Sequence, residues 1–223
     1  MAMVAVAGVA SASLYTDATG DEFSGNTILD IVSVEVQNDA TDITFTVNLN
    51  GDPTTATVSD WGKYLIGIDS VVGGDTAGNA WGRPISMSSG MDYWIGSWVD
   101  SGGGAETYSW DGAAWNLDNA TYSPPSDIGV PSVDTSSVTL TTSLASLGLS
   151  VSDTFTFDVF TTGGNGSDGA MDALSDPGVI GDWGTAYDST STLQYTVVPE
   201  PATIGLLGVA GLGMFLVRKK FKI

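Results

Sequence analysis

The sequence predicts an all-β protein, an antiparallel β-sandwich of the jelly-roll kind, with a single C-terminal transmembrane helix. Short runs of alternating apolar and polar residues indicate half-buried strands, and 29 glycines among many Asp, Asn and Ser residues indicate frequent turns. An uncharged segment near the C-terminus indicates the helix. We therefore divide the chain into residues 1–12, an acidic sandwich domain at residues 13–198, and a tail at residues 199–223.

The first segment resembles a secretory signal peptide. Residues 1–12, MAMVAVAGVASA, are small and apolar, and they end in the A-x-A pattern at which signal peptides are cut. The positively charged start of such peptides is missing, so we interpret the segment as a signal-peptide remnant with cleavage after Ala12. The alternative is an ordinary first strand.

The clearest strands form a predicted β-hairpin. Apolar side chains occupy every second position over residues 31–37 and 43–49, and the turn residues NDATD separate the two runs. Residues 144–149 are the only segment of the domain with a brief helical pattern. Eight further strands are predicted at residues 64–69, 81–87, 93–100, 107–110, 114–117, 138–142, 154–161 and 193–198. Ten short strands at this spacing favour a sandwich or jelly roll.

Charge and composition exclude several classes of function. The net charge is −20, and residues 1–198 carry 25 acidic side chains against only Lys63 and Arg83, a net charge of −23. Such a surface repels nucleic acid, so we expect no nucleic-acid partner. The chain has neither cysteine nor histidine, which removes the usual zinc ligands, cysteine nucleophiles and the Ser-His-Asp triad. We therefore expect no zinc and no enzymatic activity.

The tail combines three features in a fixed order. Pro199, Glu200 and Pro201 form a stiff, extended joint. Residues 202–217 are uncharged and would span about 24 Å as a helix, somewhat short of a hydrocarbon core of about 30 Å. A basic cluster at residues 218–222 would lie at the cytoplasmic interface, and it consists of Arg218, Lys219, Lys220 and Lys222. A buried core helix is the alternative for residues 202–217.

This combination resembles the PEP-CTERM sorting signal of Gram-negative bacteria. The resemblance covers about 25 residues and implies recognition by an exosortase, a membrane peptidase that processes such tails. It also implies organisms that make extracellular polymeric substance. The expected location is then the cell surface or the extracellular matrix, as in a biofilm, after at least transient anchoring in the membrane.

The domain has a second resemblance, carried by the order of its motifs. The hairpin VSVEVQNDATDITFTVNL, then YLIGID, a Trp-Gly-Arg loop, two tryptophan-rich strands, SLASLGLS and TFTFDVF are similar to DOMON-like sandwiches and family 9 carbohydrate-binding modules. That resemblance implies a β-sandwich that binds sugars or, in some branches, haem. Because the chain has no histidine to ligate iron, we expect no haem.

Five of the seven tryptophans are clustered in the sequence, at Trp81, Trp94, Trp98, Trp110 and Trp115. Indole rings on a surface stack on the apolar faces of sugar rings. Alternation over residues 93–100 places Tyr93 and Ile95 on one side of a strand and Trp94 and Trp98 on the other. If the first side is the core, the tryptophans face outward and can bind a glycan; the alternative is that they are themselves core residues.

Acidic residues recur beside glycines and suggest calcium ligands. One group contains Asp17, Asp21 and Glu22, a second Asp69, Asp75 and Asn79, and a third Asp168, Asp172 and Asp176. Calcium takes six to eight oxygen ligands from such loops, although none of these runs has EF-hand spacing. As candidate ligands of a structural Ca²⁺ we select Asp21, Glu22, Asp69, Asp75, Asp168 and Asp172. The alternative is that these acids are solvated turns that maintain solubility.

The predicted function is therefore that of an exported, non-catalytic carbohydrate-binding module with an extracellular polysaccharide as its partner. The alternative is a structural matrix or surface-layer protein whose acidic faces are bridged by calcium. A glycosidase would need two carboxylates at a defined separation, and no pair in the sequence is marked out for that role.

Overall fold

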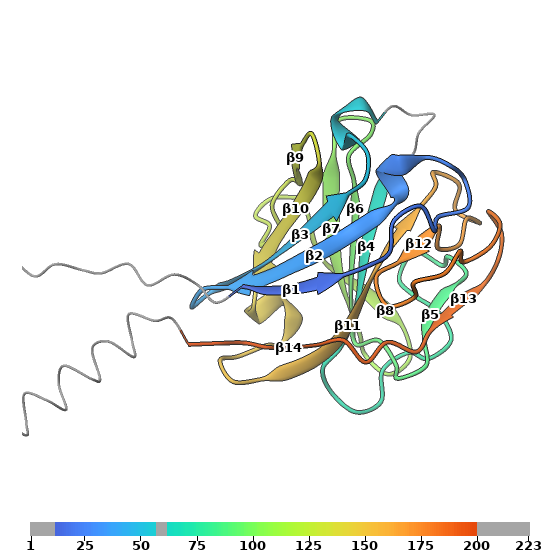
Figure 1. Ribbon diagram of the computed structural model, residues 1–223. Coiled ribbons are helices and arrows are strands. Elements are labelled where there is room, and N and C mark those ends of the chain that lie inside the picture. The colour runs from blue at the N-terminus through green and yellow to red at the C-terminus, as the bar shows by residue number, and fades with distance from the viewer. Residues whose placement is uncertain (1–11, 57–61, 200–223) are drawn as a thin grey trace, which may run out of the picture.

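The computed structural model of the chain describes residues 12–56 and 62–199. In this part of the chain, two antiparallel sheets lie face to face, which confirms the predicted all-β sandwich (Figure 1). Three short 3₁₀ helices connect strands, at η1 (Thr27–Leu29), η2 (Pro53–Thr55) and η3 (Ala145–Leu147). The third of them lies inside the segment for which the sequence predicts a brief helical turn.

The first sheet has five strands in the order β1-β2-β3-β10-β9. Their bounds are β1 (Ser13–Thr16), β2 (Ile31–Asn38), β3 (Asp42–Leu49), β10 (Ser137–Ser143) and β9 (Ser132–Asp134). The predicted hairpin is confirmed as β2 and β3, with Val36 opposite Phe45. The Asp39 carboxylate closes its turn, because Oδ1 accepts hydrogen bonds from the backbone N–H groups of Thr41 and Asp42, both at 2.8 Å.

The second sheet has seven strands in the order β12-β11-β4-β6-β7-β8, with β14 also paired to β11. Their bounds are β12 (Asp172–Ala173), β11 (Thr154–Thr162), β4 (Lys63–Asp69), β6 (Tyr93–Trp98), β7 (Gly104–Trp110), β8 (Trp115–Ala120) and β14 (Gln194–Thr196). A separate parallel pair is formed by β5 (Ile85–Met87) and β13 (Tyr187–Ser189).

The sandwich core lies between the two sheets. Alternation explains it, because every second side chain of each strand points to the same face. Phe45 of β3 and Phe157 of β11 meet there, with ring centroids 6.0 Å apart, and both are fully buried. Ile95 of β6 belongs to the same core, so the face of β6 that carries Tyr93 and Ile95 is the core face.

A second apolar cluster covers part of the opposite, outer face of the seven-stranded sheet. It joins Leu65, Trp94 and Phe160 of the sheet to Ile85, Met87 and Met91 from the chain that crosses over it. The crossing chain approaches closely at Gly67, where an added Cβ would lie 2.6 Å from the sulfur of Met91. The molecule therefore has a third layer over β11, β4 and part of β6.

All ten predicted strands are present, although the one predicted at residues 81–87 begins only at Ile85. Among the described residues, no helix has the length and hydropathy needed to cross a membrane. The predicted transmembrane helix at residues 202–217, residues 1–11 of the signal-peptide remnant, Glu200, Pro201 and the basic cluster all lie outside the described residues.

Candidate functional site

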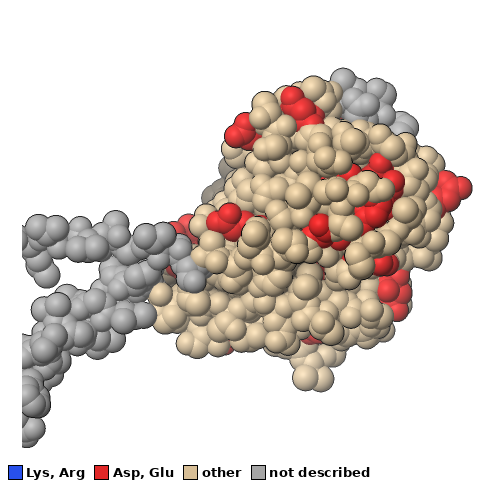
Figure 2. Space-filling view, viewed as in Figure 1, with Lys and Arg blue, Asp and Glu red and all other residues tan. Residues whose placement is uncertain are grey.

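Both cationic side chains of the domain are engaged inside the fold. Lys63 Nζ forms an ion pair with Asp100 Oδ2 at 2.5 Å. Arg83 is buried and donates hydrogen bonds from Nη1 to Thr162 Oγ1 at 3.0 Å and to the carbonyl oxygen of Asn165 at 2.8 Å. Figure 2 accordingly shows acidic side chains on the face in view and neither Lys nor Arg among the coloured residues. The described surface is therefore anionic.

Four of the five clustered tryptophans lie half-buried on the outer side of β6, β7 and β8 or beside it. Trp98 extends from β6, and Trp110 and Trp115 form the last pair of the β7-β8 hairpin, with ring centroids 5.6 Å apart. Trp81 comes from the segment before β5 and lies 6.3 Å from Trp98, centroid to centroid. The tryptophans thus form two pairs at opposite ends of β7, because Trp98 lies opposite Gly104 and Trp110 ends the strand.

Trp94 differs from the other four, because it is fully buried. Its ring stacks on Phe160 at a centroid distance of 6.4 Å, inside the cluster that fills the third layer. The prediction that Trp94 faces a ligand is therefore wrong, because its ring is covered. The alternative, in which Trp94 and Trp98 form the core face of the strand, is wrong as well, because that face carries Tyr93 and Ile95. The predicted alternation is confirmed, because Trp94 and Trp98 do lie on the face opposite Ile95.

Two glycines let indole rings lie directly on the sheet. An added Cβ at Gly96 would lie 2.3 Å from Cζ2 of Trp81, and one at Gly104 would lie 2.2 Å from Cζ2 of Trp98. Each ring therefore rests against a strand backbone that has no side chain at that point. Both rings are only half-buried, so part of each is exposed to solvent. We call these two rings, together with Tyr108 and Tyr122, the aromatic platform.

Glu106 lies at the centre of this platform and accepts three hydrogen bonds. Its Oε2 accepts from Trp81 Nε1 at 2.8 Å and from the Tyr108 hydroxyl at 2.7 Å. Its Oε1 accepts from the Tyr122 hydroxyl at 2.5 Å. The hydrogen bond to Glu106 is the main cause of a raised pKa of Tyr122, whereas burial is the main cause of the raised pKa of Tyr108. Both phenols are thus held as donors that fix the carboxylate.

Substitution of Gly96 tests whether this geometry depends on the missing side chain. In Gly96→Ala the new Cβ displaces the Trp81 ring, and we expect a loss of about 1–3 kcal/mol in the free energy of unfolding. Denaturant unfolding measures it. Gly184→Ala is the matched control, since its Cβ would meet nothing within 4 Å, and its expected effect is within about 0.5 kcal/mol. Equal stability of the two variants would contradict the proposed contact.

A second constellation of functional interest is a group of three carboxylates. One oxygen each from Asp17, Asp21 and Asp172 lies within 4.8 Å of the others. Asp17 directly follows β1, Asp21 lies in the loop before η1, and Asp172 begins β12. Figure 1 shows the chain that follows β1 running beside β12, and Figure 2 shows acidic side chains gathered in the same region. Two of the predicted calcium ligands, Asp21 and Asp172, are thus brought together.

A fourth carboxylate, Asp30, influences this group electrostatically. Its charge is among the causes that raise the pKa of Asp17 and that of Asp21. Burial is the largest cause for both residues and for Asp172, and it raises the pKa of Asp17 to about 7 and that of Asp172 to about 8. Mutual repulsion adds to each shift, because every carboxylate here has a like-charged neighbour.

The other predicted calcium ligands are engaged elsewhere. Glu22 Oε2 accepts from the backbone N–H of Ser24 at 2.7 Å, and Asp168 Oδ2 accepts from that of Asn165 at 2.9 Å. Asp75 Oδ2 accepts from Trp115 Nε1 at 2.9 Å, so this carboxylate positions a tryptophan. In the part of the chain that the structure describes, Asp17, Asp21 and Asp172 are the one group of three acids close enough to share a metal ion.

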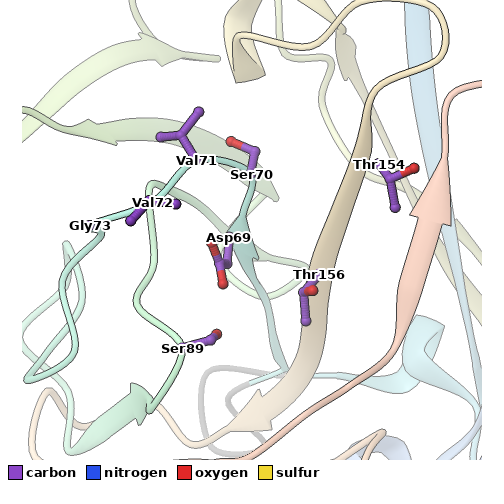
Figure 3. A pocket seen from close by; sticks show the side chains of 8 residues that line it. All are labelled: Asp69, Ser70, Val71, Val72, Gly73, Ser89, Thr154 and Thr156. Carbon is purple, nitrogen blue, oxygen red and sulfur yellow. The ribbon is translucent and has the colours of Figure 1, made fainter.

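Asp69 lines an open hollow of about 390 Å³ between the loop after β4 and the start of β11 (Figure 3). The hydroxyl residues Ser70, Ser89, Thr154 and Thr156 and two exposed valines complete its walls. Asp69 and Thr156 face each other in the β4-β11 pairing. No aromatic side chain lines this hollow, so it offers polar contacts without a stacking surface.

The sequence did not reveal Glu106, Tyr108, Tyr122 or Asp30 as site residues. The alternation of β7 places Glu106 and Tyr108 on one face with Trp110, and this spacing could have marked them. Tyr122 and Asp30 lie outside the strands, in segments whose positions depend on contacts between distant parts of the chain.

Comparison with known proteins identifies one feature. The family model of the PEP-CTERM protein-sorting motif matches residues 197–220, which confirms the resemblance of the tail. The motif supports export, processing by an exosortase and membrane-associated sorting to the cell surface. No curated protein matches the chain significantly, and the resemblance of the domain to carbohydrate-binding modules stays a prediction.

Proposed function

We propose that the domain binds neutral polysaccharide at the surface, or in the extracellular matrix, of a Gram-negative bacterium, without catalysing a reaction. The aromatic platform of Trp81, Trp98, Tyr108 and Tyr122 around Glu106 is the observation that carries this proposal. The sorting motif supplies the location, because it supports delivery of the domain to the cell surface.

The platform has the two parts that sugar recognition needs. Its ring faces suit the apolar face of a pyranose, and its polar groups suit sugar hydroxyls. Glu106 is held by three donors, so Trp81, Tyr108 and Tyr122 keep a defined arrangement before any ligand arrives. A preorganised surface loses little entropy when it binds.

The negative charge of the domain favours uncharged polymers as ligands. Because Lys63 is paired with Asp100 and Arg83 is buried, the domain offers an acidic polysaccharide no free cation among its described residues. The net charge of −23 over residues 1–198 repels such a polymer. A neutral glucan or xylan meets no such repulsion.

The alternative is a structural protein whose molecules are bridged by calcium. The acidic surface supports this alternative (Figure 2). However, the group of three carboxylates that lie closest to one another includes Asp21 and Asp172, which are buried. A cation held there would be enclosed within one molecule and would not bridge two. A glycosidase is disfavoured because both oxygens of Glu106, the acid in the platform, already accept hydrogen bonds from side chains.

Affinity electrophoresis tests the proposal directly. The full chain, kept in solution with mild detergent, is run through gels that contain dextran, laminarin, xylan or alginate. We expect retardation by at least one neutral polymer and none by alginate. Trp98→Ala should weaken binding about tenfold, which corresponds to about 1.4 kcal/mol.

Leu14→Ala provides the control, since Leu14 is an exposed apolar residue on β1 of the opposite sheet. It should bind as the wild type does. If none of the polymers retards the wild-type chain, or if Trp98→Ala and Leu14→Ala bind equally well, the platform is not the binding surface. Calcium-dependent self-association without glycan binding would favour the alternative.

A further inference from the structure

The group of Asp17, Asp21, Asp30 and Asp172 contains buried oxygen atoms that the fold leaves unsatisfied. Within the described structure, Asp17 Oδ2, Asp30 Oδ1 and both carboxylate oxygens of Asp21 are buried and accept no hydrogen bond. Asp21 is 7% exposed and Asp30 is 1% exposed. Unpaired buried carboxylate oxygens are strongly unfavourable, so this arrangement favours a positively charged partner that these oxygens can ligate.

The remaining oxygens of these side chains are fixed by the fold. Asp30 Oδ2 accepts from the backbone N–H of Gly20 at 2.8 Å and from Asn50 Nδ2 at 2.9 Å. Asp172 Oδ2 accepts from the backbone N–H of Ile31 at 2.6 Å, and its Oδ1 accepts from that of Ala173 at 2.8 Å. These bonds orient the carboxylates, as supporting hydrogen bonds do around metal sites. Each bonded oxygen of Asp172 retains a lone pair for a further ligand.

No side chain of the domain supplies the missing positive charge. Lys63 is held by Asp100, and Arg83 donates to Thr162, Asn165 and Asp168. These are the two basic residues of the sandwich domain. Apart from protons bound by the carboxylates themselves, a compensating positive charge therefore has to come from outside the polypeptide.

We propose that Asp17, Asp21 and Asp172 bind a single Ca²⁺ ion beside the carboxylate of Asp30. All the available donors are carboxylate oxygens, which suits a hard cation and not zinc or copper. The donors come from loops and from one strand end, a flexible arrangement that suits calcium better than the strict octahedron of Mg²⁺. Backbone carbonyl groups or water complete the six to eight ligands that calcium takes.

The ion would connect the two sheets of the sandwich. Asp17 follows β1 at the edge of the five-stranded sheet, and Asp172 lies in β12 at the edge of the seven-stranded sheet. The hydrogen bond from the backbone N–H of Ile31 in β2 to Asp172 already links the two sheets, and a bound ion would hold the loop of residues 17–30 against them. Binding is thus coupled to folding, and the domain is most stable where free calcium is plentiful. This inference is independent of glycan binding.

Calcium titration of the full chain in detergent, after removal of metal by EDTA, tests the site. We expect isothermal titration calorimetry to show one ion per chain and the midpoint of thermal unfolding to rise by about 5 °C or more at saturation. In Asp21→Asn the affinity should fall at least tenfold, because one oxygen becomes an amide nitrogen that cannot ligate. Asp134→Asn, an exposed residue on β9, is the matched control and should bind as the wild type does.

Asp17→Asn is the second variant, in case Asp21→Asn does not fold, since Asp17 is only half-buried. The proposal is overturned if calcium at about 10 mM, above the dissociation constants of extracellular modules, neither binds nor raises the midpoint. It is also overturned if both Asn variants bind as tightly as the wild type. An equal response to Mg²⁺ would overturn the assignment to calcium.

Discussion

Replacement of Trp94 by alanine is expected to lower the free energy of unfolding by about 3–5 kcal/mol. Trp94 is fully buried, and its ring stacks on Phe160 beneath the chain that carries Met87 and Met91. Its removal leaves a cavity in the third layer, which the sheet on one side cannot close. Urea unfolding, followed by circular dichroism, measures the loss.

Trp94→Phe separates the ring volume from the indole N–H. Among the described contacts, Nε1 of Trp94 has no hydrogen-bond partner, so phenylalanine removes an unsatisfied donor and a smaller volume. We expect it to cost far less than alanine does. Trp98→Ala, a half-buried position, should leave most of the stability intact while weakening glycan binding. A stable Trp94→Ala variant with reduced glycan binding would contradict the separation of the two roles.

The same alternation that places both tryptophans on one face cannot say which part of that face is covered. The cover over Trp94 comes from Ile85 and Met91, with support from Ala170 and Ala173, nearly eighty residues later in the chain. Trp98, at the end of β6, lies beyond that cover. Tertiary packing therefore determines which tryptophan is buried and which is exposed. The alternation of the strand alone does not contain this information.

The strands, too, are only partly predictable from the sequence. Long alternating runs such as those of β2 and β3 are evident from the sequence, because one buried face imposes a period of two. Four further strands are absent from the prediction: β1, β9, β12 and β13, at residues 13–16, 132–134, 172–173 and 187–189. They are too short for a period to be seen, and each exists because a neighbouring strand offers backbone partners.

The group of Asp17, Asp21, Asp30 and Asp172 is only partly predictable from the sequence, for a related reason. Asp17 and Asp21 lie in one acidic run of the sequence, from which Asp21 but not Asp17 is predicted as a ligand, whereas Asp172 joins them through a strand pairing at the opposite end of the domain. Asp30 resembles any acid that precedes a strand. Its significance comes from its burial and from an oxygen without a partner, and both are properties of the folded chain.

Buried carboxylates also determine how stability should depend on pH. Asp158 is fully buried on β11, and burial raises its pKa from 3.8 to about 6, although four hydrogen bonds, including those from Ser175 Oγ and Ser189 Oγ, oppose the shift. The folded state therefore binds this proton more tightly than the unfolded state does. Its contribution to stability is complete below pH 4 and is lost as the pH rises through about 6.

The expected result is that the metal-free protein becomes less stable as the pH rises from about 4 to about 8. A shift of about two pKa units for Asp158 corresponds to about 3 kcal/mol. Asp17 and Asp172, with pKa values raised to about 7 and about 8, act in the same direction and extend the loss toward pH 8. Asp39 and Asp111 have lowered pKa values and therefore oppose this loss of stability. Both are exposed, so solvent screens their effect.

Urea unfolding in EDTA at pH 5, 6, 7 and 8 measures this dependence, and Asp158→Asn supplies its control. The amide is isosteric with the carboxyl group, and the hydroxyls of Ser175 and Ser189 can rotate to accept from its N–H₂. Between pH 5 and pH 7, the free energy of unfolding of this variant should therefore fall less with pH than that of the wild type, because the contribution of Asp158 is missing. Stability that rises with pH in EDTA would contradict the assignment, because it would require the buried carboxylates to be better stabilised in their ionised form than they are in water.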